Sequence, residues 1–229
     1  MKKRGFTLAE VLITLAIIGI VATMTLPALM NNSAEQQAKT GLKKGINTLT
    51  EAAATEQALN GVDYSTFTSL TAPDSATLEE NPNTFFAILN NRVSVDFNRL
   101  NVTATAREGG LDANYYEVPF RDGTSVLYEE SGTVDTTVAA DGLPVGFVVI
   151  YDTNGAKQPN IMSNCQGTSG GALETQTLAE EDEDATELNL DVAACNSKTD
   201  RVIRDRFALR LRGTSVVPEG PAATWAYNN

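Results

Sequence analysis

The chain of 229 residues contains no histidine, only two cysteines and a single tryptophan. The absence of histidine removes the general base of Ser-His and Cys-His nucleophiles. Two cysteines without histidine also argue against a structural zinc site, which takes four protein ligands. The missing residue types therefore exclude histidine-dependent hydrolases and leave little basis for a zinc protein.

Basic side chains are scarce, with 17 Lys and Arg against 29 Asp and Glu and a formal net charge of −12. Because affinity for nucleic acid depends on clusters of Lys and Arg, this balance argues against nucleic acid as a general partner. Residues 167–171, Gly-Thr-Ser-Gly-Gly, have the spacing of a hydrolase nucleophile elbow, but no histidine and no preceding strand support it. We expect a flexible glycine-rich loop there, no enzymatic activity and no cofactor.

One long hydrophobic run is present, from residue 6 to residue 30, and Glu10 is its only ionisable side chain. It follows a short basic segment of Lys2, Lys3 and Arg4. The run is long enough to cross a bilayer core of about 30 Å as a helix. Its positive end is expected to stay cytoplasmic.

Glu10 decides between the interpretations of this run, which are a secretory signal peptide, a plain membrane anchor or a processed leader followed by an assembly helix. A carboxylate in hydrocarbon costs on the order of a few kcal/mol, and a signal peptide or anchor has no use for it. If the chain is cut between Gly5 and Phe6, the new α-amine lies one helical turn from Glu10 and can pair with it.

Residues 5–15, Gly-Phe-Thr-Leu-Ala-Glu-Val-Leu-Ile-Thr-Leu, resemble the class III signal of type IV pilins and of the pseudopilins of type II secretion systems. The resemblance implies that a prepilin peptidase cleaves after Gly5 and methylates the amino group of Phe6. It also implies that Glu10 is the residue needed for assembly. Removing residues 1–5 would delete three positive charges and take the net charge from −12 to −15.

The resemblance implies a structural fibre subunit whose partners are identical or homologous subunits, the prepilin peptidase, and an inner-membrane assembly platform with its motor. The protein would span the cytoplasmic membrane once, with an extracytoplasmic head, and then enter a periplasmic or cell-surface fibre. Whether it is a major pilin, a minor pilin or a pseudopilin stays open. The alternative is an uncleaved, membrane-tethered extracytoplasmic binding domain.

The predicted domains are a leader at 1–5, a long helix at 6–60 whose membrane and assembly segment is 6–30, and a globular head at 61–229. Gly19 and Pro27 lie where related helices loosen, and Pro27 is expected to bend the helix without ending it. After Pro27 the helical period continues in an apolar stripe that the head must cover. The stripe comprises Ala38, Leu42, Ile46, Leu49, Ala53 and Leu59.

The head is predicted to be an antiparallel sheet lying over that stripe, which makes the fold α+β. Alternating or aromatic segments predict strands at 93–97, 115–120, 125–129, 146–151 and 206–212, with a short helix at 84–90. Tight turns are expected at 121–124 and 152–155, the second with Asn154 and Gly155 in a hairpin. Residues 146–155, 159–160 and 205–209 also resemble sheet segments of some pseudopilin-like proteins, with an insertion between Asn160 and Asp205.

The insertion holds both cysteines and an acidic run. If the head is exported, Cys165 and Cys195 are expected to form a disulfide worth roughly 3 to 4 kcal/mol, the alternative being two free thiols. Residues 180–187 place six carboxylates in this acidic loop, 165–195. We interpret them as a solvated tip, with calcium binding as the alternative, although the spacing is not that of an EF-hand. Asp152 and Asn154 are likewise interpreted as turn residues, with a role as cation ligands as the alternative.

Arginines are concentrated near the C-terminus, in the predicted strand 206–212. Its alternation places Phe207, Leu209 and Leu211 on a buried face, and arginines on the other. The arginine row comprises Arg201, Arg204, Arg206, Arg210 and Arg212. We expect a solvated sheet face, with pairing to the acidic run or capture of DNA as the other interpretations.

Overall fold

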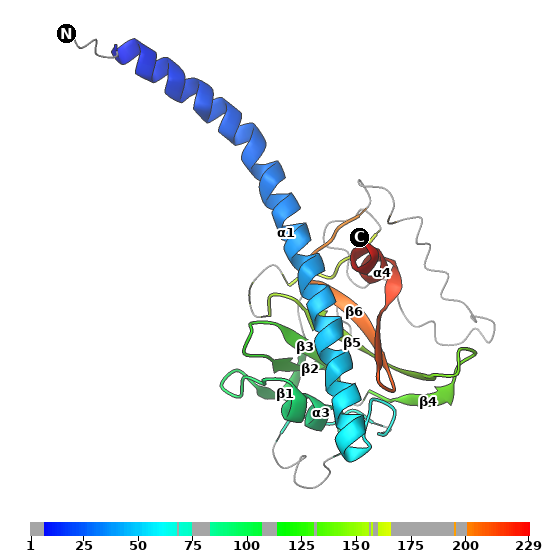
Figure 1. Cartoon of the computed structure of the whole chain (residues 1–229). Coiled ribbons are helices and arrows are strands. Elements are labelled where there is room, and N and C mark those ends of the chain that lie inside the picture. The colour runs from blue at the N-terminus through cyan, green and yellow to red at the C-terminus, as the bar shows by residue number, and fades with distance from the viewer. Residues whose placement is uncertain are drawn as a thin grey trace. The chain divides into compact units, whose positions relative to one another are not determined.

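The structure is a computed structural model of the chain, and it describes residues 7–67, 69–74, 83–106, 114–130, 132–155, 157, 160–165, 195 and 201–229. The chain divides into two compact units, Met1–Gln37 and Ala38–Asn229. Helix α1 (Leu8–Asn60) belongs to both (Figure 1). It continues through Pro27 and ends at Asn60, where the sequence predicted its end. The architecture is α+β and pilin-like, a long N-terminal helix with an antiparallel sheet.

The part of α1 in the second unit, residues 38–60, is called here the packed half. Its buried apolar residues recur at three- and four-residue spacing, as the predicted stripe requires. They are Ala38, Leu42, Ile46, Leu49, Ala52 and Ala53. Leu59 was wrongly assigned to the stripe, since its side chain is 66% exposed at the end of the helix.

Two glycines let the packed half approach the sheet. A Cβ atom added to Gly45 would lie 2.4 Å from the ring of Tyr151, and one added to Gly41 would lie 2.8 Å from Cβ of Thr153. Glycine lowers helix propensity, so these positions weaken the helix locally. The close packing depends on these glycines, because a larger residue would collide with Tyr151 of β5 or with Thr153, which follows it.

Within the described residues, seven strands form the antiparallel sheet of the second unit, in the order β1-β2-β3-β5-β6-β7, and β4 pairs with β5 beside this path. Figure 1 shows the packed half of α1 crossing this sheet. The strands are β1 (Asn101–Ala106), β2 (Asn114–Pro119), β3 (Ser125–Glu129), β4 (Asp135–Val138), β5 (Pro144–Asp152), β6 (Arg206–Arg212) and β7 (Ser215–Pro218).

Two short helices accompany the packed half of α1 in the described residues of the second unit. Helix α3 (Phe85–Arg92) begins after Thr84, whose Oγ1 accepts a hydrogen bond from the backbone N–H of Ala87 at 3.1 Å. Helix α4 (Gly220–Asn228) follows β7 and buries three alanines. The sequence predicted α3 but not α4, although Pro221 at the start of α4 is a typical helix-start signal.

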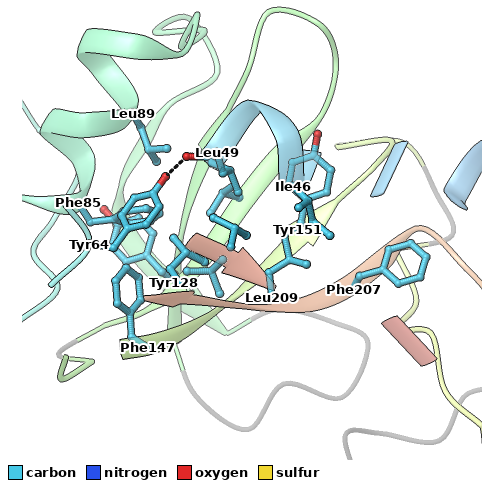
Figure 2. Packing of buried hydrophobic residues seen from close by; sticks show 14 of the residues in the cluster. Ile46, Leu49, Tyr64, Phe85, Leu89, Tyr128, Phe147, Tyr151, Phe207 and Leu209 are labelled. Atoms are coloured by element: carbon cyan, nitrogen blue, oxygen red, sulfur yellow. Dashed lines mark hydrogen bonds between the residues drawn. The ribbon is translucent and has the colours of Figure 1, made fainter. Parts of the chain in front are cut away.

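The main core lies between the packed half of α1, α3 and one face of the sheet. Figure 2 shows Tyr64, Phe85, Tyr128 and Phe147 packed together beneath Leu49. The rings of Phe85 and Tyr128 lie 5.1 Å apart in an edge-to-face arrangement, which aromatic pairs favour. The buried hydroxyl of Tyr64 donates to the carbonyl oxygen of Leu49 at 2.8 Å, so the core leaves this polar group satisfied.

The insertion leaves the sheet and returns to it through two segments that pair with each other, 160–165 and 201–206, called here the neck. Asn164 and Val202 exchange two backbone hydrogen bonds of 2.9 and 2.8 Å, and Ser163 N–H donates to the carbonyl of Arg206. Cys165 and Cys195 are joined by a disulfide and are both buried in the main core cluster. The neck is therefore closed covalently as well as by backbone bonds.

Three expectations for the sheet were wrong. Residues 93–97 form no strand: Val95 makes a single bridge to Phe120, and Asp96 then accepts bonds from Asn98 and Arg99 that turn the chain. Strand β6 is not the last strand, because β7 and α4 follow it. The turn at 152–155 closes no hairpin, since the described residues that follow it belong to the neck and not to a strand. Gly155 does have the positive φ of a tight turn.

Candidate functional site

The candidate site is the beginning of α1, where Leu8–Thr25 is long and apolar enough to cross a membrane. None of these 18 residues is buried within the structure, and the large apolar side chains are between 46% and 81% exposed. Such a continuous apolar surface is stable only when lipid or another apolar surface covers it. The segment is therefore built to be covered by something outside this chain.

Glu10 lies in the first turn of α1, where it forms a reciprocal cap with Thr7. The Thr7 backbone N–H and its hydroxyl both donate to Glu10 Oε2 at 2.8 Å. In return the Glu10 N–H donates to Thr7 Oγ1 at 3.3 Å. This is a capping box, which satisfies backbone donors that every helix start leaves free. The Glu10 carboxylate thus has two donors within its own chain.

The cap lowers the free-energy cost of placing a carboxylate at the edge of a membrane's hydrocarbon core. A charged group without partners is expensive there, and each hydrogen bond to it lowers the cost. A carboxylate near the positive end of the helix dipole is also favoured electrostatically. Thr7 was not assigned a role from the sequence, although the Thr-x-x-Glu pattern at the start of an apolar run is a recognised cap signal.

Besides Glu10, the apolar segment contains three polar side chains, all of them threonines. Thr14, Thr23 and Thr25 each donate a hydrogen bond to a backbone carbonyl three or four residues earlier, at 2.8 to 3.0 Å. Hydroxyls satisfied inside the helix are compatible with lipid. Within Leu8–Thr25, the cap at Glu10 is therefore the only charged feature.

Gly19 has open space around it: a Cβ atom added there would meet nothing within 4 Å. It differs in this from Gly41 and Gly45, which the packing of the head requires. Gly5 and Phe6, the residues expected to flank the cleavage site, lie outside the described residues. Their predicted roles rest on the sequence.

Three arginines of the row, Arg206, Arg210 and Arg212, form ion pairs in the described residues, where a solvated face was expected. Arg206 is 2% exposed, and its Nε donates to Asp152 Oδ2 at 2.9 Å. Arg210 makes two bonds of 2.8 and 2.9 Å to Glu219. Arg212 pairs with Asp141. Arg206, Arg210 and Arg212 thus have ion-pair partners outside the acidic run, within the described part of the head.

Asp152 acts as a turn and ion-pair residue. Its Oδ1 accepts from the backbone N–H groups of Asn154 and Gly155 at 3.1 and 2.8 Å, while Oδ2 is bound to Arg206. Burial raises the pKa of the Asp152 carboxyl, an effect that Arg206 opposes. In the part of the chain that the structure describes, no three Asp, Glu, Cys or His side chains gather as metal ligands. The acidic run 180–187 and the glycine-rich residues 167–171 lie outside that part.

Comparison with known proteins agrees with the position of this site. Residues 1–26 match the family described as the prokaryotic N-terminal methylation motif, the prepilin-type signal of type IV pilins and pseudopilins. The match covers residues 1–5, the capped first turn and the apolar segment. No match was found among curated proteins or among solved structures.

Proposed function

We propose that this chain, which carries the prokaryotic N-terminal methylation motif at residues 1–26, is the precursor of a structural subunit of a type IV pilus-like or type II secretion pseudopilus fibre. The observation that carries the proposal is a fully exposed apolar helix segment with one carboxylate, capped by Thr7 in its first turn. A motif of this kind implies cleavage by a prepilin peptidase. We place the cut between Gly5 and Phe6, followed by methylation of Phe6.

Cleavage changes the surroundings of Glu10. It creates an ammonium or methylammonium group at Phe6, one helical turn away, where it competes with Thr7 for the carboxylate. A charge-assisted hydrogen bond is stronger than a neutral one, and more so in a poorly solvated environment. Glu10 can therefore exchange a hydroxyl partner for a cationic one, in its own chain or in a neighbouring subunit, and so fix the axial register of an entering helix.

The physical reason for assembly is the uncovered surface of Leu8–Thr25. The helix leaves lipid only if an equally apolar surface receives it, and a bundle of homologous helices provides one. Extraction requires energy, which we assign to a cytoplasmic motor acting through an inner-membrane platform. We propose that the head, residues 61–229 with the packed half of α1, stays extracytoplasmic, first at the membrane and later in a periplasmic or cell-surface fibre.

Two further features support an exported head. The basic residues Lys2, Lys3 and Arg4 precede the apolar segment, which favours a cytoplasmic N-terminus. The Cys165–Cys195 disulfide is typical of proteins outside the cytoplasm. A structural role needs no catalytic group, and we assign this chain no enzymatic activity. The alternative is a binding domain that stays tethered by an uncut leader.

The test is to replace Glu10 and count incorporation into fibres in the native host. Glu10→Leu makes the segment more apolar, so insertion should become easier by about 2 kcal/mol or more on insertion scales, whereas fibre entry should fail or slow. The matched control is Glu51→Leu, which removes an exposed carboxylate from the packed half of the same helix. Normal incorporation of a Glu10→Leu protein that is inserted, cleaved and folded would refute the role of Glu10.

A further inference from the structure

Trp225 is the only tryptophan in the chain and lies on α4, where two cationic side chains cover its ring. The ammonium nitrogen of Lys39 is 4.1 Å from the ring centroid, and Cζ of Arg201 is 3.5 Å from it. Lys39 is 6% exposed, so this contact is largely removed from water. Cation–π contacts strengthen when they are desolvated. The ring therefore joins three segments that are distant in the sequence.

Helix α4 has few other anchors. Its buried side chains are Ala222, Ala223 and Ala226, and an alanine buries little apolar area. Its N-cap residue, Glu219, makes no side-chain cap bond and binds Arg210 instead. Trp225 is the largest side chain that anchors α4: it packs against the main core, and the two cations lie over its ring.

Arg201 connects this ring to the disulfide. One of its guanidinium nitrogens, Nη1, donates to the carbonyl oxygen of Cys195 at 3.2 Å. That oxygen is fixed in place because Cys195 is bonded to Cys165 and is fully buried. A planar guanidinium that stacks on an aromatic ring while donating in its own plane is held in a single orientation.

Lys39, the second cation over the ring, belongs to the first turn of the packed half of α1. The second unit begins at Ala38, and both Ala38 and Leu42 are buried in the main core. A contact that holds Lys39 therefore holds the turn at which α1 joins the head domain. The contacts form a continuous path from the disulfide through Arg201 and Trp225 to α1.

We propose that this path is a redox-sensitive latch, in which formation of the Cys165–Cys195 disulfide locks the first turn of the packed half of α1. In the chemical step both thiols lose a proton and together give up two electrons as the S–S bond forms. The electrons pass to the disulfide of an extracytoplasmic thiol–disulfide oxidoreductase, which is reduced to a dithiol. Oxidation fixes the Cys195 carbonyl, which orders Arg201 on Trp225. Trp225 then holds Lys39.

The latch closes only where disulfides form, so the head of an exported subunit would be completed after translocation. This consequence rests on the proposed function, but the latch itself does not. It can be tested on purified full-length protein without any fibre. If the latch is refuted, the proposed assembly role of Glu10 still stands. If the role of Glu10 is refuted, the latch still stands.

The experiment measures acrylamide quenching of Trp225 and amide hydrogen exchange of residues 38–46, in full-length protein in detergent micelles. The oxidised protein is compared with protein reduced by a phosphine, and with Arg201→Ala and Arg201→Lys in the oxidised state. Loss of one partly desolvated cation–π contact should make exchange about fivefold faster and Trp225 more accessible. Arg201→Lys should fall between, because lysine keeps the charge without the planar stack. Arg204→Ala is the matched control.

The oxidised Arg201→Ala protein tests directly whether Arg201 couples the disulfide to Trp225, because its disulfide is intact. Wild-type quenching and exchange in that variant would overturn the latch. Equal effects of Arg204→Ala and Arg201→Ala would also overturn it, since loss of charge alone would then explain the change. Reduction that leaves Trp225 unchanged in a protein with native far-UV circular dichroism would remove the disulfide from the path. If reduction unfolds the head, faster exchange in oxidised Arg201→Ala still supports the path, and unchanged exchange refutes it.

Discussion

Residues 8–25 and 38–60 belong to one continuous helix, yet their apolar side chains have opposite surroundings. In Leu8–Thr25 none is buried, whereas in the packed half the stripe from Ala38 to Ala53 is almost completely covered by the sheet and α3. The first segment is apolar all round and the second on one face only. A helix segment with a single apolar stripe can be covered by its own domain, whereas a segment that is apolar all round needs a surrounding apolar environment.

The carboxylates of the two regions show the same contrast. Glu56 is 4% exposed and accepts hydrogen bonds from Asn60, Asn91 and Arg92, which belong to α1 and α3. Glu10 is exposed, and both hydrogen bonds to its carboxylate come from Thr7, three residues away. The head supplies Glu56 with a permanent set of partners. Glu10 carries a local cap that a new cation could displace.

The sharpest test of the comparison makes the same truncation in both regions. Leu49→Ala should lower the free energy of unfolding of the head by about 2 to 5 kcal/mol, because a fully buried leucine leaves a cavity. Leu15→Ala should leave it unchanged, since Leu15 is 60% exposed. The measurement is urea unfolding of full-length protein in detergent, followed by Trp225 fluorescence. Equal losses from the two variants would contradict the division of α1 into these regions.

The second test concerns Glu56 and its dependence on pH. Burial alone would raise the pKa of Glu56, but hydrogen bonds from Asn60, Arg92 and Asn91 outweigh it and lower the pKa. Since the folded-state pKa lies below the unfolded one, this stabilisation is present above the unfolded pKa and is lost as pH falls through the folded pKa. Glu56→Gln should cost about 1.5 to 3 kcal/mol at pH 7 and flatten the acid limb of stability against pH.

The control for this prediction is Glu10→Gln, which should leave both the stability of the head and its acid limb unchanged. Urea titrations at a series of pH values from neutral to acid would measure both variants. An acid limb that survives in Glu56→Gln would show that other carboxylates produce it, and the assignment to Glu56 would fail.

The third test compares glycines. Gly45→Ala should destabilise the head by about 1 to 3 kcal/mol, because the new Cβ atom would lie 2.4 Å from the Tyr151 ring and one of the two must move. Gly19→Ala meets no atom within 4 Å in this chain, so the head should be as stable as wild type. Thermal unfolding of the two variants side by side decides the matter. Stabilisation by Gly45→Ala would mean that helix propensity outweighs packing there.

The sequence could predict the parts of the fold that depend on local pattern. The end of α1 at Asn60, strand β3 and strand β6 follow from periodicity and turn residues, as does the turn at Gly123, where φ is 94°. Helix propensity alone disfavours glycine at position 45, and only the position of Tyr151 explains why glycine is needed there. Such packing contacts join residues far apart in the chain, which periodicity does not report.

The errors have the same origin. Residues 93–97 alternate like a strand, but the side chain of Asp96 turns the chain by binding Asn98 and Arg99. Arg206 alternates like a solvent-facing residue, but Asp152 pairs with it across β5 and β6, and neck residues lie beside it. Alternation distinguishes the two faces of a strand and does not tell whether both are covered.

The site at the start of α1 was more accessible to sequence analysis, because its residues are neighbours. The spacing of Thr7 and Glu10 is enough to define a capping box. The path through Arg201, Trp225 and Lys39 could not be predicted, since its members come from three separate segments. Its signal in the sequence is limited to the single tryptophan.

We propose that the exposed apolar segment belongs to a processed subunit that is assembled through its N-terminus. The most direct measurement is the intact mass of the protein isolated from its native membrane and from assembled fibres, with Gly5→Leu as an uncut reference. We predict a mature chain that begins at Phe6 and carries one N-methyl group, while Gly5→Leu stays in the membrane with its full leader. Fibre-derived protein that still begins at Met1 would contradict the account and favour an uncut, membrane-tethered binding domain.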